Sequence, residues 1–544
     1  MRRVGLGVIM AVVVVGAARL GPACTNFLIT KGASADGSVM ITYAADAHDF
    51  YGELSLRPPG VHRPGATREV IEWDTGKYLG QIAQAPITYS VVGNMNEHQV
   101  AIGETTFGGR EELQGSGLVD YGSLMFIALE RATTAREAIR VIGDTVAEYG
   151  YASDGESFSI SDPDEVWIME IMGKGEEDPG AVWVARRVPD GFISAHANQA
   201  RIRTFPLDDP DNCLHSDDVI SFARDRGYFN GPDAEFSFAD VYAPLDFGAL
   251  RFCEARVWCF FERAAASRNV PSNWVEGDVT AEPVPLWIKP DRKLGVRDVM
   301  AMMRDHFEGT PLDMTRDIGA GPYGLPYRWR PLTWEVDGVT YFNERAVSTQ
   351  QTGFSFVAQS RSWLPDPVGG VLWFGVDDTA STVYFPVYCA SREVPPSFAA
   401  GNGSLVDFTW DSAFWVFNWV ANFSYLRYNL MIEDVHQVQQ ELEGLFLTEQ
   451  AGVEKAALEL HGRSPRLAVD YLTDYTVRMG EMVTERWRRL GEDLLVKYLD
   501  GNVKTPDGEV EHPGYDDSWY RRVAEQEGER LQVKPQPEPE DEGE

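Results

Sequence analysis

One stretch of the chain decides the fold: Cys24-Thr25-Asn26-Phe27-Leu28-Ile29-Thr30, then Lys31-Gly32-Ala33-Ser34-Ala35-Asp36-Gly37, then Ser38-Val39-Met40-Ile41-Thr42-Tyr43. The outer pieces are apolar runs, and the middle piece is made of small and polar residues. Two apolar runs joined in this way are typical of antiparallel strands and their connection. We therefore predict a β-hairpin that begins directly after Cys24.

Further along the chain, short apolar runs at 91–92, 100–103, 157–161 and 165–171 predict more strands. Residues 122–150 carry apolar side chains at helical spacing instead. Strands, then helix, then strands again predict an α+β fold with antiparallel sheets, because a parallel fold would alternate the two element types.

The second half of the chain changes character. A short helix is predicted at 299–307, and residues 323–395 are strand-like and rich in aromatic residues, with turns at Asp337-Gly338 and Gly369-Gly370. Residues 413–498 are predicted to be mostly helical. The motif at 319–324 matches a dinucleotide fingerprint, but Pro322 and Pro326 exclude the helix that this motif requires, so a loop is expected.

The first 23 residues are typical of a secretory signal. Arg2 and Arg3 precede an apolar run at 4–18, which is shorter than the roughly 20 residues that span a bilayer, and the small residues 21–23 fit a cleavage site. Cleavage after Ala23 would make Cys24 the N-terminus of a secreted or periplasmic protein. A retained membrane anchor is one alternative. Lipidation of Cys24 is another, although Gly21 stands where a lipoprotein signal prefers a Leu-like residue.

Composition excludes several classes of protein. The 544 residues include 48 Lys and Arg against 83 Asp and Glu, a net charge of −35, which opposes nucleic-acid binding. A hydrophobic content of 44% excludes a largely disordered chain. Five Cys and nine scattered His predict no metal site. Four of the Cys could form disulfides or remain as buried thiols: Cys213, Cys253, Cys259 and Cys389.

An N-terminal Cys24 would carry a nucleophile and a base on one residue. A free α-amine has a pKa of about 7.7–8.0 and a thiol one of about 8.5, so the neutral amine can accept the thiol proton. This chemistry suits acyl transfer to water. The alternative is that Cys24 merely follows a signal or serves as a lipid attachment point.

Several blocks of the chain, in order, resemble the dipeptidase A family of cysteine N-terminal-nucleophile (Ntn) hydrolases. This family is related to secernins and, more distantly, to penicillin V acylase and bile salt hydrolase. The blocks lie at 24–38, 96–106, 196–199, 308–311, 350–354 and 373–378. The resemblance implies a four-layer αββα sandwich, no metal or organic cofactor, and hydrolysis of dipeptides that have a free amino end.

The resemblance also implies roles for individual residues. Cys24 matches the nucleophile, and Asp46 matches a carboxylate that contacts its α-amine. Asn198 resembles the residue that binds the oxyanion, and Arg256 resembles an arginine near the nucleophile. Tyr43 departs from the pattern, because many relatives carry there an Arg that would lower the thiol pKa.

Glu104 and Thr105 are the candidate substrate-binding residues. Thr105 takes the place of the second oxyanion Asn of bile salt hydrolases. Glu104 follows an apolar run, where a strand could end at the site, and an acidic side chain could hold the ammonium group of a dipeptide. A surface Glu that ends a strand is the alternative.

The predicted organisation is therefore a signal at 1–23, a catalytic domain at 24–400, a mainly helical region packed on it at 401–532 and a disordered acidic tail at 533–544. The expected partners are small peptide substrates, without nucleic acid and without a membrane after signal removal. The oligomeric state is left open. Two alternatives to a secreted dipeptidase remain: an N-acyl amide hydrolase of the same fold, and a non-catalytic lipid-anchored binding protein.

Overall fold

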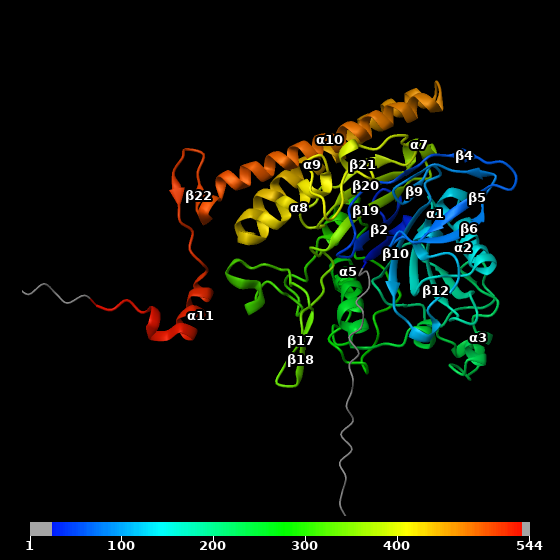
Figure 1. Ribbon diagram of the computed structural model, residues 1–544, viewed down its shortest axis with the longest axis horizontal. Coiled ribbons are helices and arrows are strands. Elements are labelled where there is room, and N and C mark those ends of the chain that lie inside the picture. The colour runs from blue at the N-terminus through cyan, green and yellow to red at the C-terminus, as the bar shows by residue number, and fades with distance from the viewer. Residues whose placement is uncertain (1–23, 536–544) are drawn as a thin grey trace, which may run out of the picture.

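The computed structural model describes residues 24–535, and two large antiparallel β-sheets lie at its centre (Figure 1). The seven-stranded sheet has the order β16-β14-β1-β2-β19-β20-β21. Its strands are β1 (Asn26–Ile29), β2 (Val39–Asp46), β14 (Ile193–His196), β16 (Trp287–Ile288), β19 (Thr352–Ser360), β20 (Val371–Val376) and β21 (Phe385–Tyr388). The fold is therefore α+β, as the order of the predicted elements indicated.

The eight-stranded sheet has the order β15-β13-β12-β11-β10-β9-β8-β3. Its strands are β3 (Leu56–Arg57), β8 (Val91–Val92), β9 (Met95–Asn96), β10 (Ala101–Phe107), β11 (Gly155–Ser161), β12 (Val166–Gly173), β13 (Ala181–Arg187) and β15 (Cys213–His215). Small two-stranded sheets are formed by β4 (Gly60–Val61) with β7 (Ile87–Thr88), β5 (Thr67–Ile71) with β6 (Tyr78–Ala83), β17 (Thr333–Val336) with β18 (Val339–Phe342), and β22 (Val503–Lys504) with β23 (Val510–Glu511).

The two large sheets approach closely where β10 crosses β1 and β2. A Cβ atom on Gly103 would lie 2.7 Å from Asn26 Nδ2 and 3.1 Å from Tyr43 Cβ. Real Cβ atoms do not come so close to other atoms, so a larger residue here would push the sheets apart. This contact brings β10 next to the start of β1, where Cys24 lies.

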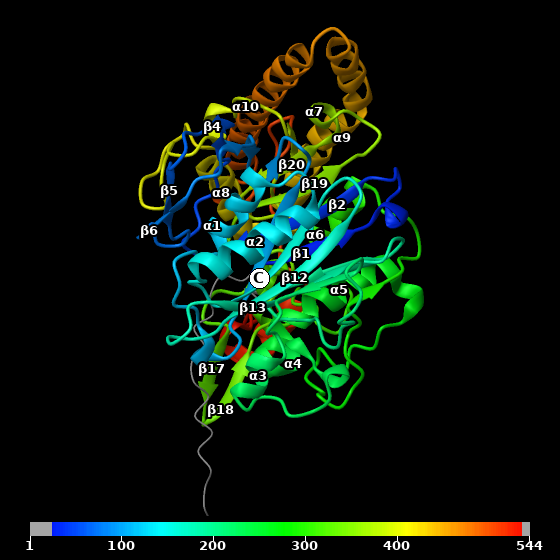
Figure 2. The same ribbon diagram turned by 90° about the vertical axis from the view of Figure 1, so that its right-hand side faces the viewer.

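Helices α1 (Tyr121–Arg131) and α2 (Ala135–Tyr149) cover the outer face of the eight-stranded sheet (Figure 2). Ile102 and Trp167 of the sheet share a buried cluster with Leu124 and Ile139 of the helices. The Thr134 side chain accepts a hydrogen bond from the Glu137 amide and thereby caps α2. The helical pattern at 122–150 thus corresponds to two helices with a break before Thr134.

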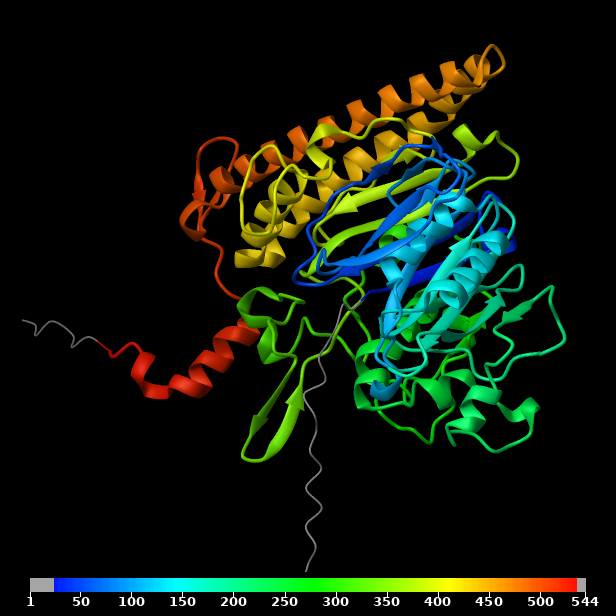
Figure 3. The same ribbon diagram turned by 45° about the vertical axis from the view of Figure 1, so that its right-hand side comes forward.

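Helices also cover the outer face of the seven-stranded sheet (Figure 3). The rings of Phe27 in β1 and Phe260 in α5 stack at a centroid distance of 4.0 Å. Near the other edge, Tyr388 in β21 donates its main-chain N–H to the Thr476 hydroxyl of α10 over 3.3 Å, and this hydroxyl lies 3.4 Å from the Pro386 carbonyl oxygen. The helices concerned are α5 (Ala255–Ala265), α6 (Val296–Met303), α8 (Ala413–Ser424), α9 (Tyr428–His461) and α10 (Pro465–Lys497).

Shorter helices connect or extend these layers: α3 (Ser221–Asp225), α4 (Phe238–Tyr242), α7 (Asp366–Gly369) and α11 (Asp517–Glu527). No helix between residues 24 and 535 is both long and apolar enough to cross a membrane. The predicted signal at 1–23 and most of the predicted tail, 536–544, lie outside the described residues. The domain boundaries at 400 and 532 stay predictions.

The hairpin predicted after Cys24 is confirmed, because β1 and β2 pair antiparallel with Leu28 opposite Ile41. The strands expected at 157–161 and 165–171 also pair, as β11 and β12. The Asp337-Gly338 turn joins β17 to β18 with a positive φ at both residues. The helical region at 413–498 is confirmed as α8, α9 and α10.

Two local expectations need correction. The helix predicted at 299–307 lies earlier, at Val296–Met303, because the Asp298 carboxylate accepts from the Gly295 amide at 2.8 Å and fixes its start. The predicted turn at Gly369-Gly370 is the end of the short helix α7. The motif at 319–324 forms no α-helix, and its 3₁₀ turn is interrupted at Gly321, where φ is 63°.

Candidate active site

Cys24 lies at the start of β1, against the end of β2, and is fully buried. The next residue, Thr25, exchanges two main-chain hydrogen bonds with Ala44, and these fix Cys24 at the sheet. The thiol donates a hydrogen bond to Glu104 Oε1 over 3.5 Å and lies 3.9 Å from the Tyr43 hydroxyl oxygen. The Tyr43 hydroxyl donates to the same Glu104 oxygen.

The surroundings of Cys24 favour the neutral thiol. Burial raises the pKa of the thiol well above its ordinary value, and the charges of Glu104 and Asp46 raise it further, whereas a hydrogen bond from the Asp46 main chain lowers it. In the full chain the nitrogen of Cys24 is part of the peptide bond to Ala23 and is not basic. The site therefore needs another base before Cys24 can act as a nucleophile.

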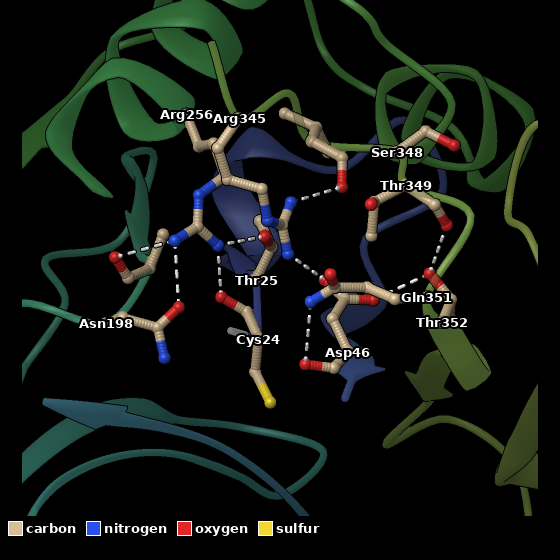
Figure 4. Close-up of polar contacts among 12 residues, drawn as sticks. Cys24, Thr25, Asp46, Asn198, Arg256, Arg345, Ser348, Thr349, Gln351 and Thr352 are labelled. Carbon is tan, nitrogen blue, oxygen red and sulfur yellow. Dashed lines mark hydrogen bonds and ion pairs between the residues drawn. The ribbon is translucent and has the colours of Figure 1, made fainter. Parts of the chain in front are cut away.

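Arg256 of α5 binds the main chain of Cys24 (Figure 4). Its Nη1 donates to the Cys24 carbonyl oxygen and, over 2.7 Å, to the Thr25 hydroxyl. Its Nη2 donates to Asn198 Oδ1 over 2.8 Å, and its Nε donates to the Phe252 carbonyl oxygen over 2.7 Å. Burial lowers the pKa of Arg256 to about 10, so the guanidinium stays charged at neutral pH. Arg256 thus joins two of the predicted site residues.

Asn198 follows β14 and has a left-handed main chain, with φ at 59°. Asn tolerates this conformation better than most residues. Its Nδ2 donates to the Thr106 carbonyl oxygen over 2.7 Å. The side-chain amide is therefore oriented from both of its ends, by Arg256 and by the end of β10.

Asp46 is the last residue of β2, three residues beyond the apolar run that predicted this strand, and its carboxylate is fully buried. It forms an ion pair with Arg345 Nη2 at 2.6 Å and accepts from the Thr352 hydroxyl at 2.6 Å (Figure 4). Burial raises the pKa of Asp46, while the charge of Arg345 lowers it in part. These partners fix the carboxylate at the end of the strand that lies beside Cys24.

Thr105 faces away from Glu104, since adjacent residues of a strand point to opposite faces. Its hydroxyl hydrogen-bonds His196 Nδ1 over 2.7 Å, and Ser159 bonds the other ring nitrogen over 2.7 Å. Burial lowers the pKa of His196 to about 3, so the ring is neutral. The substrate-binding role of Thr105 stays a prediction.

The structure thus brings Cys24, Glu104, Arg256 and Asn198 into one hydrogen-bonded site, with Asp46 beside Cys24 at the end of β2. Sequence reasoning missed three residues that contact them, namely Arg345, Thr352 and Glu156. Thr352 lies inside one of the blocks that resemble the dipeptidase A family, and Glu156 directly precedes a predicted strand, so the sequence offered a reason to consider both residues. Arg345 carried none.

The described residues 24–535 include no group of three His, Cys, Asp or Glu side chains placed to hold a metal ion. All five Cys are free thiols, which decides the question of disulfides left open by the sequence. Burial raises the pKa of Cys213 to about 11 and that of Cys389 to about 12. These thiols are therefore neutral at physiological pH.

Comparison with known proteins adds independent evidence. Residues 58–441 match the family model described as peptidase family C69. The matched segment includes Asn198 and Arg256 and begins after Cys24. A probable dipeptidase of Latilactobacillus sakei is 25% identical over 495 residues, covering 85% of this chain and 95% of that protein. A probable dipeptidase of Salmonella dublin is 25% identical over 390 residues, covering 69% of this chain and 82% of that protein. A dipeptidase of Bifidobacterium longum (strain NCC 2705) is 26% identical over 340 residues, covering 55% of this chain and 61% of that protein.

Proposed function

Because this chain belongs to peptidase family C69, we propose that it is a secreted or periplasmic cysteine dipeptidase whose nucleophile is Cys24. The names of the relatives support a dipeptide substrate. One observation carries the assignment of the nucleophile: the Cys24 thiol contacts Glu104 while its main chain is held by Arg256, which also binds Asn198. Cys389, by contrast, donates to main-chain carbonyl oxygens, those of Glu97 and Asp366, and not to a carboxyl group.

We propose further that the fold is the four-layer αββα sandwich of Ntn hydrolases. The two stacked sheets, with α1 and α2 on one outer face and α5, α6 and α8–α10 on the other, support this proposal. So does the position of Cys24 at the start of a central strand, where cleavage after Ala23 would expose an α-amine.

In the proposed reaction, the Cys24 α-amine accepts the thiol proton, and the thiolate sulfur attacks the carbonyl carbon of the dipeptide. The C–N bond then breaks, the leaving amine takes the proton from the Cys24 ammonium, and water hydrolyses the thioester. Asp46 would orient the amine while Arg345 holds its carboxylate in place. Asn198 would donate to the oxyanion, since Arg256 and Thr106 orient its amide near Cys24.

Glu104 would bind the ammonium group of the dipeptide. Its carboxyl oxygen lies 3.5 Å from the Cys24 sulfur, and the amino group of a dipeptide is separated from the scissile carbonyl by a single carbon. A carboxyl group next to the nucleophile can therefore reach the ammonium while the sulfur reaches the carbonyl carbon. This geometry favours a free dipeptide over an N-acylated one.

The test is a substrate panel on the secreted, processed protein, comparing free dipeptides with the same dipeptides after N-acetylation. We expect hydrolysis of the free dipeptides only, and loss of this activity in Cys24→Ala. Cys213→Ala is the matched control, because Cys213 is also a buried thiol but lies in β15, and it should keep full activity.

Two outcomes would replace the proposal. Equal or faster hydrolysis of acetylated substrates would favour the N-acyl amide hydrolase. The lipid-anchored binding protein would be favoured by a diacylglyceryl adduct on Cys24, detected by mass spectrometry, in a protein that binds dipeptides but does not hydrolyse them.

A further inference from the structure

Two glutamates face each other beside Cys24, on neighbouring strands of the eight-stranded sheet. Glu104 lies in β10 and Glu156 in β11, where Glu156 stands opposite Thr106 in the antiparallel register. Glu104 and Thr106 are two residues apart, so Glu104 and Glu156 share one face as diagonal neighbours. Both side chains are fully buried.

Each carboxyl group has one oxygen that receives a hydrogen bond from another kind of side chain. Glu104 Oε1 accepts from Tyr43 and from the Cys24 thiol, and Glu156 Oε2 accepts from the Thr106 hydroxyl at 3.0 Å. The other two oxygens, Glu104 Oε2 and Glu156 Oε1, are buried and have no donor among the described residues. The two carboxyl groups interact electrostatically, and the charge of Glu104 adds to burial in raising the pKa of Glu156. Carboxylate oxygens are acceptors only, so a proton on one of the two groups would give these buried oxygens the donor that they lack.

No positively charged side chain among residues 24–535 compensates the pair. Neither Glu104 nor Glu156 forms an ion pair within residues 24–535. The titratable groups that face them are Cys24, Tyr43 and Asp46 from the seven-stranded sheet, Tyr121 from α1 and Asp74 from the β5–β6 loop. The side chains of all of these residues are neutral or negative, and burial raises the pKa of both glutamates. Two negative charges this close in a buried site are unfavourable without a cation.

We propose that the Glu104–Glu156 pair holds one proton in the free protein and releases it to solvent when the ammonium group of a dipeptide binds. This inference deepens the proposed function and rests on it. The ammonium group keeps its three protons and donates hydrogen bonds to both carboxylates, so no covalent bond other than the O–H bond breaks. Glu104 is the residue that touches both substrate and nucleophile, and Glu156 is a positioning residue that holds the exchangeable proton.

The proposal distinguishes substrate recognition from a purely structural carboxyl pair. Dipeptide binding should strengthen with rising pH until the dipeptide amine itself loses its charge, near a pKa of about 7.7–8.0. An N-acetylated ligand has no ammonium group and should bind without releasing a proton. A structural pair would keep its proton with either ligand.

The experiment is isothermal titration calorimetry of the processed protein with an uncleavable dipeptide isostere, in which a thiomethylene group replaces the scissile amide. Titrations at pH 7 in two buffers of different ionisation enthalpy give the number of protons released. We expect about one proton per bound isostere. The N-acetylated isostere should release none and should bind at least tenfold more weakly.

Glu156→Gln should abolish the proton release, because its amide donates to Glu104 and leaves no proton to exchange. Glu170→Gln is the matched control, since Glu170 is also fully buried, lies on the neighbouring strand β12 and has a pKa raised by burial to about 8, but binds the main chain at Arg201 and Ile202. This control should release the same number of protons as the unmodified protein.

Binding of the isostere without proton release, or release that persists in Glu156→Gln, would overturn the inference. Failure of the isostere to bind would overturn it as well. Failure of the proposed function is a separate result, because it is measured as absent turnover of free dipeptides by the unmodified protein.

Discussion

The Arg256 guanidinium donates a hydrogen bond of 2.8 Å to the side-chain oxygen of Asn198. This bond decides which way the amide faces, because its oxygen is committed to the arginine and its nitrogen must point elsewhere. The same guanidinium binds the carbonyl oxygen of Cys24. One buried cation therefore sets the position of the proposed nucleophile relative to the group proposed to bind the oxyanion.

Replacing Asn198 by Ala should reduce kcat by about 10²–10³, the usual cost of one lost oxyanion donor, which corresponds to about 2.7–4 kcal/mol. KM should change much less, because the oxyanion forms after substrate binding. Steady-state kinetics on a free dipeptide measures both constants. An effect on KM alone would assign Asn198 to substrate anchoring instead.

Replacing Arg256 by Lys should lower kcat by at least about tenfold, since an ammonium group cannot reproduce the fork that binds Cys24, Thr25 and Asn198 together. Arg256→Lys keeps the charge, so a loss of activity in a folded protein identifies geometry as the cause. Circular dichroism would confirm the fold. Unchanged kcat in Arg256→Lys would mean that the charge alone suffices.

The active protein should begin at Cys24. Only then does its nitrogen become an amine that can accept the thiol proton, which the buried thiol needs because its pKa is raised. N-terminal sequencing or intact mass of the secreted protein measures this directly. Full activity in a protein with any other first residue would disprove the proposed base.

Replacing Glu104 by Gln should lower the pKa of the Cys24 thiol, because the charge of Glu104 raises it in the unmodified protein. The change is in the direction that favours the thiolate. The rate of Cys24 alkylation by iodoacetamide as a function of pH reports this pKa. Dipeptide turnover should fall in the same variant. Loss of structure would also expose the thiol and lower its pKa, so circular dichroism must show that Glu104→Gln is folded.

The ion pair between His306 and Glu308, 3.1 Å apart, should make stability depend on pH. Burial opposes the charge of His306, but Glu308 still raises the pKa of His306, and His306 lowers the pKa of Glu308 to about 2 against the effect of burial. The stabilisation from Glu308 is present above about pH 4.5, the pKa of this group in the unfolded chain, and is lost toward pH 2. The stabilisation from His306 is present below about 6.5 and is lost as pH rises through its higher folded value.

Glu308→Gln should therefore lower the free energy of unfolding most between about pH 4.5 and 6.5, and by only about 1 kcal/mol, because the Glu308 side chain is half exposed and solvent screens the pair. Urea unfolding at pH 2.5, 5.5 and 9 would measure the difference. An equal loss at all three values would point to packing instead of charge.

The sequence predicted strands and helices well where apolar residues form a continuous run or recur at helical spacing, as in β1, β2, β11 and α10. The apolar pattern ended the second strand at Tyr43, and it was the family resemblance that pointed to Asp46, the residue at which β2 ends. The sequence could not predict the ion pair between Asp46 and Arg345, since these residues are 299 positions apart and Arg345 lies in a segment without periodicity.

The two candidate substrate residues illustrate the same limit. Glu104 and Thr105 are adjacent in sequence, yet Glu104 reaches Cys24 and Thr105 reaches His196. Alternation along a strand tells us that the two face opposite ways. Which of them faces Cys24 depends on how the two sheets stack, and the sequence of β10 alone does not contain this information.

The hydroxyl of Thr476 lies against the outermost strand of the seven-stranded sheet, where Tyr388 donates to it and the Pro386 carbonyl oxygen lies 3.4 Å away. An uncovered strand edge offers unpaired main-chain groups to any other extended chain, and so it promotes aggregation. In this protein α10 occupies that edge. A shortened protein that ends near residue 400 would keep all of the proposed catalytic side chains, but it would expose this edge and should be recovered as insoluble material.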